Sequence, residues 1–411
     1  MKQNQQTFTG AIAFLIAVTV LSSSQAFSAG FEKSVFWSGH YAGMAGASTS
    51  TVTGAESLAF NPAGLAGSKS EVSLNFSPTT SKFSGPITTA GTSVDSKSSF
   101  SPVFGALANY RISDKLSAGI GAFVTGGTKA VYEGVALGAA VPSATIQADL
   151  GITELAAGAG YELIDGLKVG AAYRLVMVKA NLGTVLGTTP IPNYAAFDSL
   201  SSSKSGFSAG LMYSPAASKW GVGLDYRSEV SFSADGNVSL TPLAGPGAGT
   251  AGAAQAASLA GVFPQEVSVG GHYDVADSIR VAATYSWAEY IKNSSLGISG
   301  ITAPPIALNW GNLNNLRLGV ECSAVRDWAF RAGYAYASQV TPSNSARATF
   351  AAPGAGNTFT LGAGHSFGVL MANAALEYSK DSGTTTVADQ PIFGDYSASA
   401  MAAHLGVTYA F

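Results

Sequence analysis

Charged residues are scarce in this chain. Asp, Glu, Lys and Arg together make up 11% of its 411 residues, whereas roughly 25% is usual for a soluble protein. A soluble fold with so few charges would have too few polar groups to cover its surface. The formal net charge of −3 also provides no basic surface for a nucleic acid.

Residues that would carry chemistry are equally sparse. Cys322 is the only cysteine, so no internal disulfide is possible, and the four histidines lack the spacing of metal ligands. Two Gly-x-Ser-x-Gly strings, at 206–210 and 364–368, lie in an alternating segment and beside a short turn, where the strained elbow of a hydrolase is not expected. We predict that the chain is not an enzyme and holds no metal or cofactor.

Long apolar runs are missing beyond the N-terminus. After residue 29 no stretch of eighteen apolar residues occurs, so no transmembrane helix is expected. The apolar stretch 11–21 follows Lys2 and precedes small residues, which predicts a cleaved signal peptide over 1–28, with cleavage after Ser28 or Ala29. Hydrophobic residues nevertheless make up 47% of the chain. An exported hydrophobic chain without helical spans is expected to form closed β-structure, because every backbone group must be paired in lipid.

What the sequence does contain is alternation with a period of two. In residues 220–227 the even positions are Trp, Val, Leu and Tyr, and the odd positions are small or polar; residues 279–287 alternate in the same way. Successive side chains of a strand point to opposite faces, so each segment has one apolar face. A soluble β-sandwich would give the same pattern with its apolar face turned inward.

The lengths of the links distinguish these two architectures. Short turns at 113–115, 165–166, 277–278 and 326–328 alternate with long links at 85–98, 127–146, 186–200, 241–262, 299–313, 342–356 and 384–396. Short periplasmic turns, long extracellular loops and an even strand number are typical of a bacterial outer-membrane barrel. We therefore predict an all-β fold, a transmembrane antiparallel barrel of about fourteen strands over 69–411. The strands are expected at 71–84, 99–112, 116–126, 147–164, 167–185, 201–215, 220–240, 263–276, 279–298, 314–325, 329–341, 357–367, 369–383 and 397–411.

The C-terminal strand supports this location. Leu405, Val407, Tyr409 and Phe411 share one face of it, and a terminal aromatic resembles the signal read by the outer-membrane assembly machinery. We expect Phe411 to contact that machinery, and the protein to be a monomer in contact with lipid and lipopolysaccharide in the outer membrane of a Gram-negative bacterium. Tyrosines near strand ends fit an interfacial aromatic girdle; they are Tyr161, Tyr173, Tyr213, Tyr226, Tyr273, Tyr334 and Tyr378.

Residues 29–68 have a different character. They are rich in Gly, Ala, Ser and Thr and contain too few large apolar residues for a core of their own. The segment is either a disordered periplasmic tail or a plug inside the barrel. Within it, Asn61 can cap a helix through its side-chain oxygen and Pro62 suits the first helical position, so one helical turn that starts with Ala63 and ends at Gly67 is expected.

Three stretches of this segment resemble a known family. Ala29-Gly30-Phe31, Tyr41 to Ala47 (YAGMAGA) and Phe60 to Leu65 (FNPAGL) are similar to the N-terminal hatch of the FadL family (OMPP1/FadL/TodX), outer-membrane transporters of long-chain fatty acids and other hydrophobic compounds. The likeness covers signal, hatch, fourteen strands and aromatic C-terminus. It implies that residues 29–68 form a hatch in the lumen, that Asn61, Pro62 and Ala63 are its motif, and that it shifts when ligand binds.

The resemblance also implies a route for the ligand. In the family, a hydrophobic ligand binds at extracellular loops, passes to a site inside the barrel and leaves sideways through a kink in the third strand. Gly126 and Gly127 either permit such a kink here or only mark the end of that strand. Leu259, Val262 and Phe263 form a ligand-binding loop or pack on neighbouring loops. A fatty acid would need a cationic partner for its carboxylate, and the candidates are Lys129, Arg174, Arg227, Arg317 and Arg331.

The function expected from these features is passive transport of a hydrophobic small molecule, a fatty acid or an aromatic hydrocarbon, through a hatch-plugged barrel with lateral exit. A structural or adhesion barrel that binds a surface partner and a general porin are the alternatives. The predicted register also places Leu318 toward lipid and Gly319 toward the lumen. Leu318→Arg near the midplane should therefore cost about 2–4 kcal/mol, and Gly319→Ser should cost much less.

Overall fold

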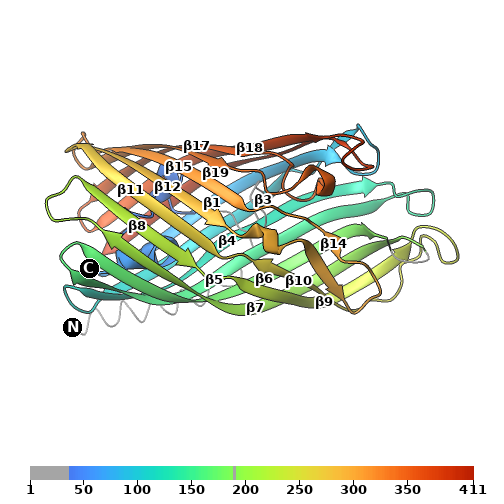
Figure 1. Ribbon diagram of the computed structural model, residues 1–411, viewed down its shortest axis with the longest axis horizontal. Helices are drawn as coiled ribbons and strands as arrows, with labels where there is room; N and C mark the ends of the chain where they lie inside the picture. The colour runs from blue at the N-terminus through green and yellow to red at the C-terminus, as the bar shows by residue number, and fades with distance from the viewer. Residues whose placement is uncertain (1–36, 188–190) are drawn as a thin grey trace.

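The computed structural model describes residues 37–187 and 191–411. The predicted signal peptide and the first part of the predicted hatch lie outside the described residues. The described chain forms a closed antiparallel barrel (Figure 1). β1 (Glu71–Pro86) closes it by pairing with β3 (Ser99–Arg111) on one side and with β19 (Gly394–Ala410) on the other. None of the helices in the described residues is both long and apolar enough to cross a membrane.

The described residues occupy fourteen strand positions around the barrel, in agreement with the predicted number. Three positions are interrupted and consist of two consecutive strands: β8 (Trp220–Arg227) with β9 (Val230–Pro242), β10 (Gln255–Phe263) with β11 (Glu266–Ala276), and β12 (Ile279–Ala288) with β13 (Ser295–Ser299). The remaining strands are β1, β3, β19, β4 (Leu116–Val135), β5 (Ala144–Ile164), β6 (Leu167–Leu186), β7 (Asn193–Tyr213), β15 (Leu313–Cys322), β16 (Trp328–Ala337), β17 (Gly356–Phe367) and β18 (Leu370–Thr385). The links contain β2 (Ser93–Asp95), β14 (Ile306–Ala307), η3 (Tyr290–Lys292) and η4 (Ser343–Ser345).

Several strands extend further into the long links than predicted. β4 continues to Val135 instead of ending at residue 126, β7 begins at Asn193 instead of residue 201, and residues 255–263 form β10 instead of part of a link. Register shifts accompany the first two errors, at Val124/Gly126 in β4 and at Ala180/Leu182 beside β7. An extra residue in one strand changes the phase of the alternation, so a continuing strand resembles a loop in the sequence.

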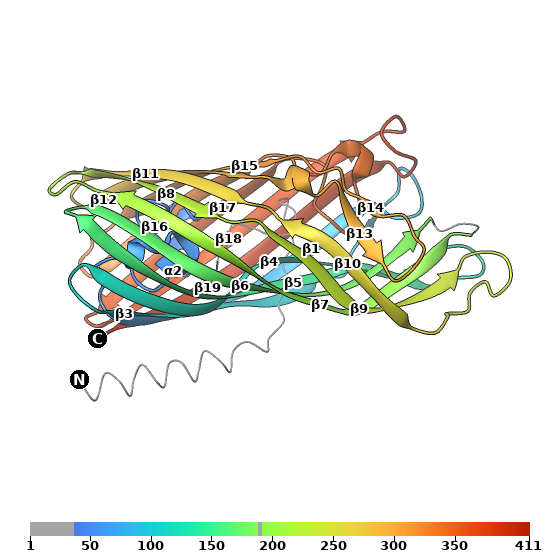
Figure 2. The same ribbon diagram turned by 60° about the horizontal axis from the view of Figure 1, so that its bottom comes forward.

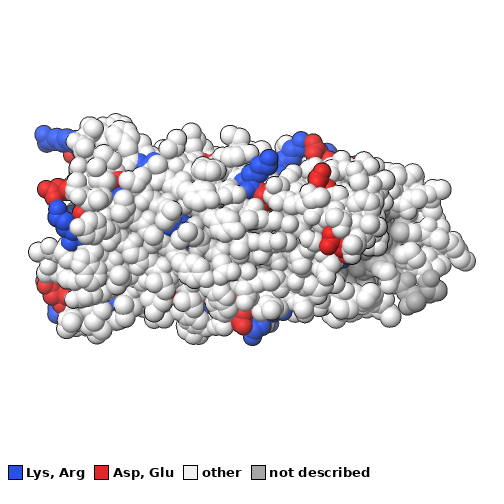
Figure 3. Space-filling view, turned by 45° about the horizontal axis from the view of Figure 1, so that its top comes forward, with Lys and Arg blue, Asp and Glu red and all other residues white. Residues whose placement is uncertain are grey.

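The outer face of the barrel is apolar. On β15, Leu316, Leu318 and Val320 are exposed, whereas Arg317 and Gly319 between them are buried, so the predicted register of this strand is correct. Figure 3 shows charged side chains at one end of the barrel and in a second zone beyond its middle, with an almost uncharged band between them. Such a band fits a surface in contact with the hydrocarbon region of a membrane.

The two ends of the barrel differ in their connections. Figure 2 shows the C-terminus and tight turns at one end and longer links at the other. We call the lumen near the short turns the periplasmic half and the lumen near the long links the extracellular half. At the periplasmic end the backbone nitrogen of Phe411 donates to the carbonyl of Ser70 (2.9 Å), which holds the last residue against the start of β1. The recognition of Phe411 by the assembly machinery stays a prediction.

Candidate functional site

Residues 37–70, here called the inner segment, lie inside the periplasmic half of the barrel (Figure 2). They contain η1 (Tyr41–Met44), α2 (Ser57–Phe60) and η2 (Pro62–Leu65). Glycines of the wall make room for them. A Cβ added to Gly160 of β5 would lie 2.6 Å from the nitrogen of Ala66, and one added to Gly319 of β15 would lie 2.7 Å from Cβ of Met44. Both approaches are too close for a side chain.

The Asn-Pro-Ala motif joins the inner segment to two wall strands. Oδ1 of Asn61 accepts from the backbone nitrogen of Ala63 (3.1 Å), which is the predicted cap, and Pro62 starts the 3-10 helix η2. Nδ2 of Asn61 donates to the carbonyls of Leu211 on β7 (3.4 Å) and Leu224 on β8 (3.3 Å). The motif therefore shapes a turn and fixes that turn to the wall at the same time.

Glu56 forms a second anchor on the opposite wall. Its carboxylate, 6% exposed, accepts from the Ser73 hydroxyl (2.6 Å) and the Asn75 amide (2.9 Å) of β1, and also from the Ser38 hydroxyl of the inner segment. Three donors compensate for the burial of this charge. Polar groups of the wall thus hold the inner segment from several sides.

An ionic cluster lies where the inner segment meets the extracellular half. Glu154 of β5 is fully buried and accepts from Nε and Nη2 of Arg174 on β6 (3.0 and 2.9 Å) and from Nη2 of Arg227 on β8 (2.9 Å). Arg227 also donates through Nη1 to the carbonyl of Ala59 (3.2 Å). The cluster binds three strands to one another and to the inner segment, and the sequence reasoning had not singled out Glu154.

The other candidate carboxylate partners occupy different positions. Arg331 of β16 contacts Glu321 (2.6 Å) and Asn373 (3.0 Å). Lys129 lies on the outer face of β4 and pairs with Asp149 (3.0 Å). Arg317 is 4% exposed, and Nη1 donates to the Ser286 hydroxyl (2.9 Å), while Nε and Nη2 have no hydrogen-bond partner among the described residues. The structure therefore does not bring the five candidates together.

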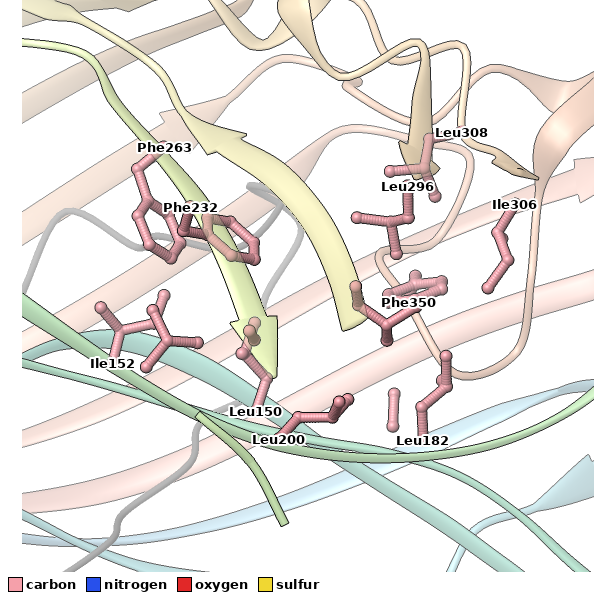
Figure 4. Packing of buried hydrophobic residues seen from close by; sticks show 14 of the residues in the cluster. Leu150, Ile152, Leu182, Leu200, Phe232, Phe263, Leu296, Ile306, Leu308 and Phe350 are labelled. Atoms are coloured by element: carbon pink, nitrogen blue, oxygen red, sulfur yellow. The ribbon is translucent and has the colours of Figure 1, made fainter. Parts of the chain in front are cut away.

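The extracellular half of the lumen contains the largest apolar cluster, here called the chamber. Inward residues of β5 to β7 form one side, including Leu150, Ile152 and Leu200, and residues of β9, β10 and the links form the other. Figure 4 shows Phe232 beside Phe263 on one side, and Leu296, Ile306 and Phe350 on the other. The rings of Phe232 and Phe263 stack with centroids 4.6 Å apart. This surface suits an apolar ligand.

The candidate binding loop is a strand in the structure. Leu259 and Phe263 of β10 are buried and belong to the chamber, whereas Val262 lies on the opposite face, where its nitrogen donates to Asn293 (3.0 Å). The small residues of 253–257 gave too weak an alternation to indicate a strand. Two of the three apolar side chains thus face the interior of the barrel rather than the outside solvent.

The wall is interrupted between β3 and β4. Their ladder runs from Arg111↔Ser117 to Gly105↔Phe123 and contains no further pair; beyond it, the backbone of Lys97 donates to the carbonyl of Val131 (2.9 Å). At the extracellular end of the ladder, β4 contains a bulge at Thr125, followed by Gly126 and by Gly127 with φ 145°. No pairing joins 98–104 to 124–130, and we call this interruption the wall gap.

A comparison of the sequence with known families finds a match over residues 19–411 to the family described as "Outer membrane protein transport protein (OMPP1/FadL/TodX)". The chain belongs to this family. Membership places it in the outer membrane of a Gram-negative bacterium, as a transport protein rather than an enzyme. No curated protein matches the sequence.

Solved structures share the fold of this FadL-family protein at low sequence identity. A FadL homologue of Pseudomonas aeruginosa matches with a TM-score of 0.77 and 18% identity over 93% of this chain and 100% of the other. The toluene transporter TodX of Pseudomonas putida gives 0.74 and 17% over 91% and 98%. CymD, a monoaromatic hydrocarbon channel, gives 0.70 and 18% over 94% and 99%. Identities this low establish the barrel architecture alone.

Proposed function

We propose that the protein carries hydrophobic small molecules across the outer membrane by passive diffusion, and that they leave sideways through the wall gap. The inner segment acts as a plug, because it fills the periplasmic half, where wall glycines leave room for it and polar groups of the wall anchor it. A molecule in the chamber meets the ionic cluster of Glu154, Arg174 and Arg227 below it. An apolar ligand that entered that cluster would leave its apolar surroundings and lie against charged groups, which is unfavourable. Movement straight through the lumen toward the periplasm is therefore disfavoured.

The observation that carries this proposal is the contact between the chamber and the wall gap. Thr128 of β4 belongs to the stretch without ladder pairs, and it lines a cavity together with the chamber residues Leu150, Leu200 and Phe232. At the periplasmic edge of the wall gap, the ring of Trp37 from the inner segment packs on the ring of Phe123, with ring centroids 5.6 Å apart. A shift of the inner segment would therefore widen the passage from chamber to membrane.

The family and its structural neighbours support two classes of substrate, long-chain fatty acids and aromatic hydrocarbons. For a fatty acid, Arg317 is the inward candidate best able to accept a carboxylate in the lumen, because its Nε and Nη2 lack partners among the described residues, whereas Arg174 and Arg331 engage carboxylates of the wall. The chamber itself would hold either class.

Uptake of labelled oleate and toluene tests the proposal in a strain that lacks the gene and in the complemented strain. Deletion of Thr125 removes the bulge residue and lets β4 continue in one register, so it should close the wall gap and reduce uptake to the level of the deletion strain. Deletion of Gly134, which removes the one extra residue at the second register shift of β4, is the matched control and should preserve uptake. Heat-modifiable migration on a gel reports folding for each variant.

Two results would overturn the proposal. Equal uptake of both compounds with and without the gene would remove the transport function. Large, steady ion currents through the purified protein in a planar bilayer would instead indicate an open porin, because a plugged lumen should not conduct continuously.

A further inference from the structure

Three neighbouring strands change from apolar to polar side chains at one level of the outer face. β19 lies between β1 and β18 in the wall. The outward side chains of β19 are apolar from Tyr409 to Met401, and the next one is Ser399. Ser399 pairs with Lys82 of β1 on one side and with Lys380 of β18 on the other. Both lysines are exposed on this face, and we call the three residues the basic row.

The basic row lies at the extracellular boundary of the apolar band. From Tyr409, at the periplasmic end of β19, to Ser399 the strand advances by ten residues, which is about 33 Å at ~3.3 Å per residue. Strands of outer-membrane barrels are tilted by about 35–45°, and their apolar band is ~25 Å tall. An advance of about 33 Å along a strand with that tilt crosses a band of this height. The basic row is therefore level with the head groups of the outer leaflet.

The positive charge of the basic row is only partly neutralised by the protein. Nζ of Lys82 contacts Asp95 of β2 (2.5 Å), and both side chains are about half exposed. An exposed ion pair of this kind contributes little stability, so another anion can replace Asp95. Nζ of Lys380 forms no hydrogen bond or ion pair with the described residues. Since one strand separates the two lysines, their backbones are ~10 Å apart, and both ammonium groups can reach one anion above Ser399.

An exposed apolar surface adjoins the basic row on its periplasmic side. The next outward row runs from Phe100 of β3 through Thr80 and Met401 to Tyr378 of β18. Phe100 is 61% exposed and Met401 65% exposed, so these large side chains project from the wall into the lipid. A ligand that contacts both rows needs an anionic group with hydrocarbon chains attached beside it. An inorganic anion would contact the basic row alone.

We propose that the basic row binds lipopolysaccharide, with one lipid A phosphate between Lys82 and Lys380 and the acyl chains on Phe100, Met401 and Tyr378. A phosphate monoester carries close to two negative charges at neutral pH, which matches two ammonium groups. The phosphodiester of a glycerophospholipid carries one. The site lies on the outside of the wall, apart from the lumen and the chamber. Neither lysine stands out in the sequence, because they come from opposite ends of the barrel sequence and meet only through the pairing of both strands with β19.

Lipid titration of the full-length protein in detergent, followed by native mass spectrometry, tests this site. The probes are lipid A, the same lipid A after enzymatic removal of its phosphates, and phosphatidylglycerol. The unaltered protein should bind lipid A at least tenfold more tightly than the other two lipids. The double variant Lys82→Gln/Lys380→Gln should bind lipid A about tenfold more weakly, which corresponds to ~1.4 kcal/mol, and should bind the dephosphorylated lipid with less than a twofold change. Asp95→Asn removes the competing carboxylate and should tighten lipid A binding about twofold or more.

Lys219→Gln is the matched control, because Lys219 is an exposed lysine at the periplasmic end, where it pairs with Asp277 (3.5 Å). It should leave all three affinities unchanged, and a loss as large as that of the double variant would indicate general charge attraction instead of a site. Equal lipid A affinity in the double variant and the unaltered protein would overturn the proposal. An equal loss for lipid A and the dephosphorylated lipid would do the same, and so would phosphatidylglycerol binding as tight as that of lipid A. If the double variant does not fold, Lys380→Gln and the order of the three lipids on the unaltered protein decide.

Discussion

The periplasmic and extracellular halves of the lumen are built from the same strands but present opposite chemistry to the interior. On β5 the change occurs between Glu154 and Ile152, and on β6 between Arg174 and Val176, in each case over two residues on the same face. The periplasmic half must satisfy the backbone groups of the inner segment, so polar side chains and glycines line it. In the extracellular half the links contribute apolar side chains of their own, among them Trp310 and Phe350, and apolar side chains of the wall pack against them.

The largest expected effect comes from removing the carboxylate at the border of the two halves. Glu154→Gln would leave the guanidinium groups of Arg174 and Arg227 buried without their anion, which should lower the free energy of unfolding by about 3–5 kcal/mol. Ile152→Val, two residues away in the chamber, should cost about 0.5–1.5 kcal/mol. Urea unfolding in lipid vesicles measures both. Similar losses for the two variants would contradict the division of the lumen into two chemistries.

The next prediction compares an arginine that faces the lumen with an arginine placed toward lipid. Arg317 is accommodated on the inner face of β15, whereas Leu318→Arg places the same side chain in the apolar band, one residue further on, and should cost about 2–4 kcal/mol. The same unfolding assay applies, with Leu318→Met as the control of matched size. An arginine variant as stable as the unaltered protein would mean that this face does not meet hydrocarbon.

A smaller effect is expected at Gly319, where the structure corrects the sequence-based expectation. Gly319→Ser was expected to cost much less than Leu318→Arg because the position faces the lumen, but its new Cβ would lie 2.7 Å from Cβ of Met44. We now expect a loss of about 1–3 kcal/mol from overpacking. Gly271→Ser is the control, since the nearest atom to its new Cβ, the carbonyl of Gly221, is 3.6 Å away, and it should change stability by less than about 0.5 kcal/mol. Equal stability of both variants would indicate that the inner segment moves aside freely.

The smallest effect concerns the anchor of the inner segment. Asn61→Ala removes the cap on η2 and the bonds to the carbonyls of Leu211 and Leu224, and loss of a cap costs about 0.5–2 kcal/mol. Hydrogen exchange of residues 57–66 should become faster while exchange in β7 stays slow. Asn344→Ala, in an exposed link, is the control. Unchanged exchange in residues 57–66 would show that Asn61 does not hold the turn.

More of the fold than of the site could be predicted from the sequence. Alternation and link lengths indicate the fourteen strands, because the lipid-facing positions must be apolar in every strand whatever the barrel contains. Strand ends could not be placed where bulges or small residues break the pattern, as at Thr125 and in residues 253–257. The site escaped prediction for another reason: Ala59, Glu154 and Arg227 come from separate parts of the chain, and their contacts follow only from closure of the barrel around the inner segment. Leu259 and Phe263 were selected for their apolar character, and the structure places them on β10, facing the chamber, instead of in a link.

The glycines of the periplasmic wall have a consequence for redesign. Several of them leave room for one particular part of the inner segment, as Gly170 does for the carbonyl of Pro62 and Gly210 for the side chain of Asn61. The barrel wall and the inner segment are therefore matched to each other in shape. An inner segment taken from a relative would not match the positions of these glycines. Attempts to alter selectivity by grafting are therefore best confined to the chamber, where side chains can be exchanged without changing the backbone of the wall.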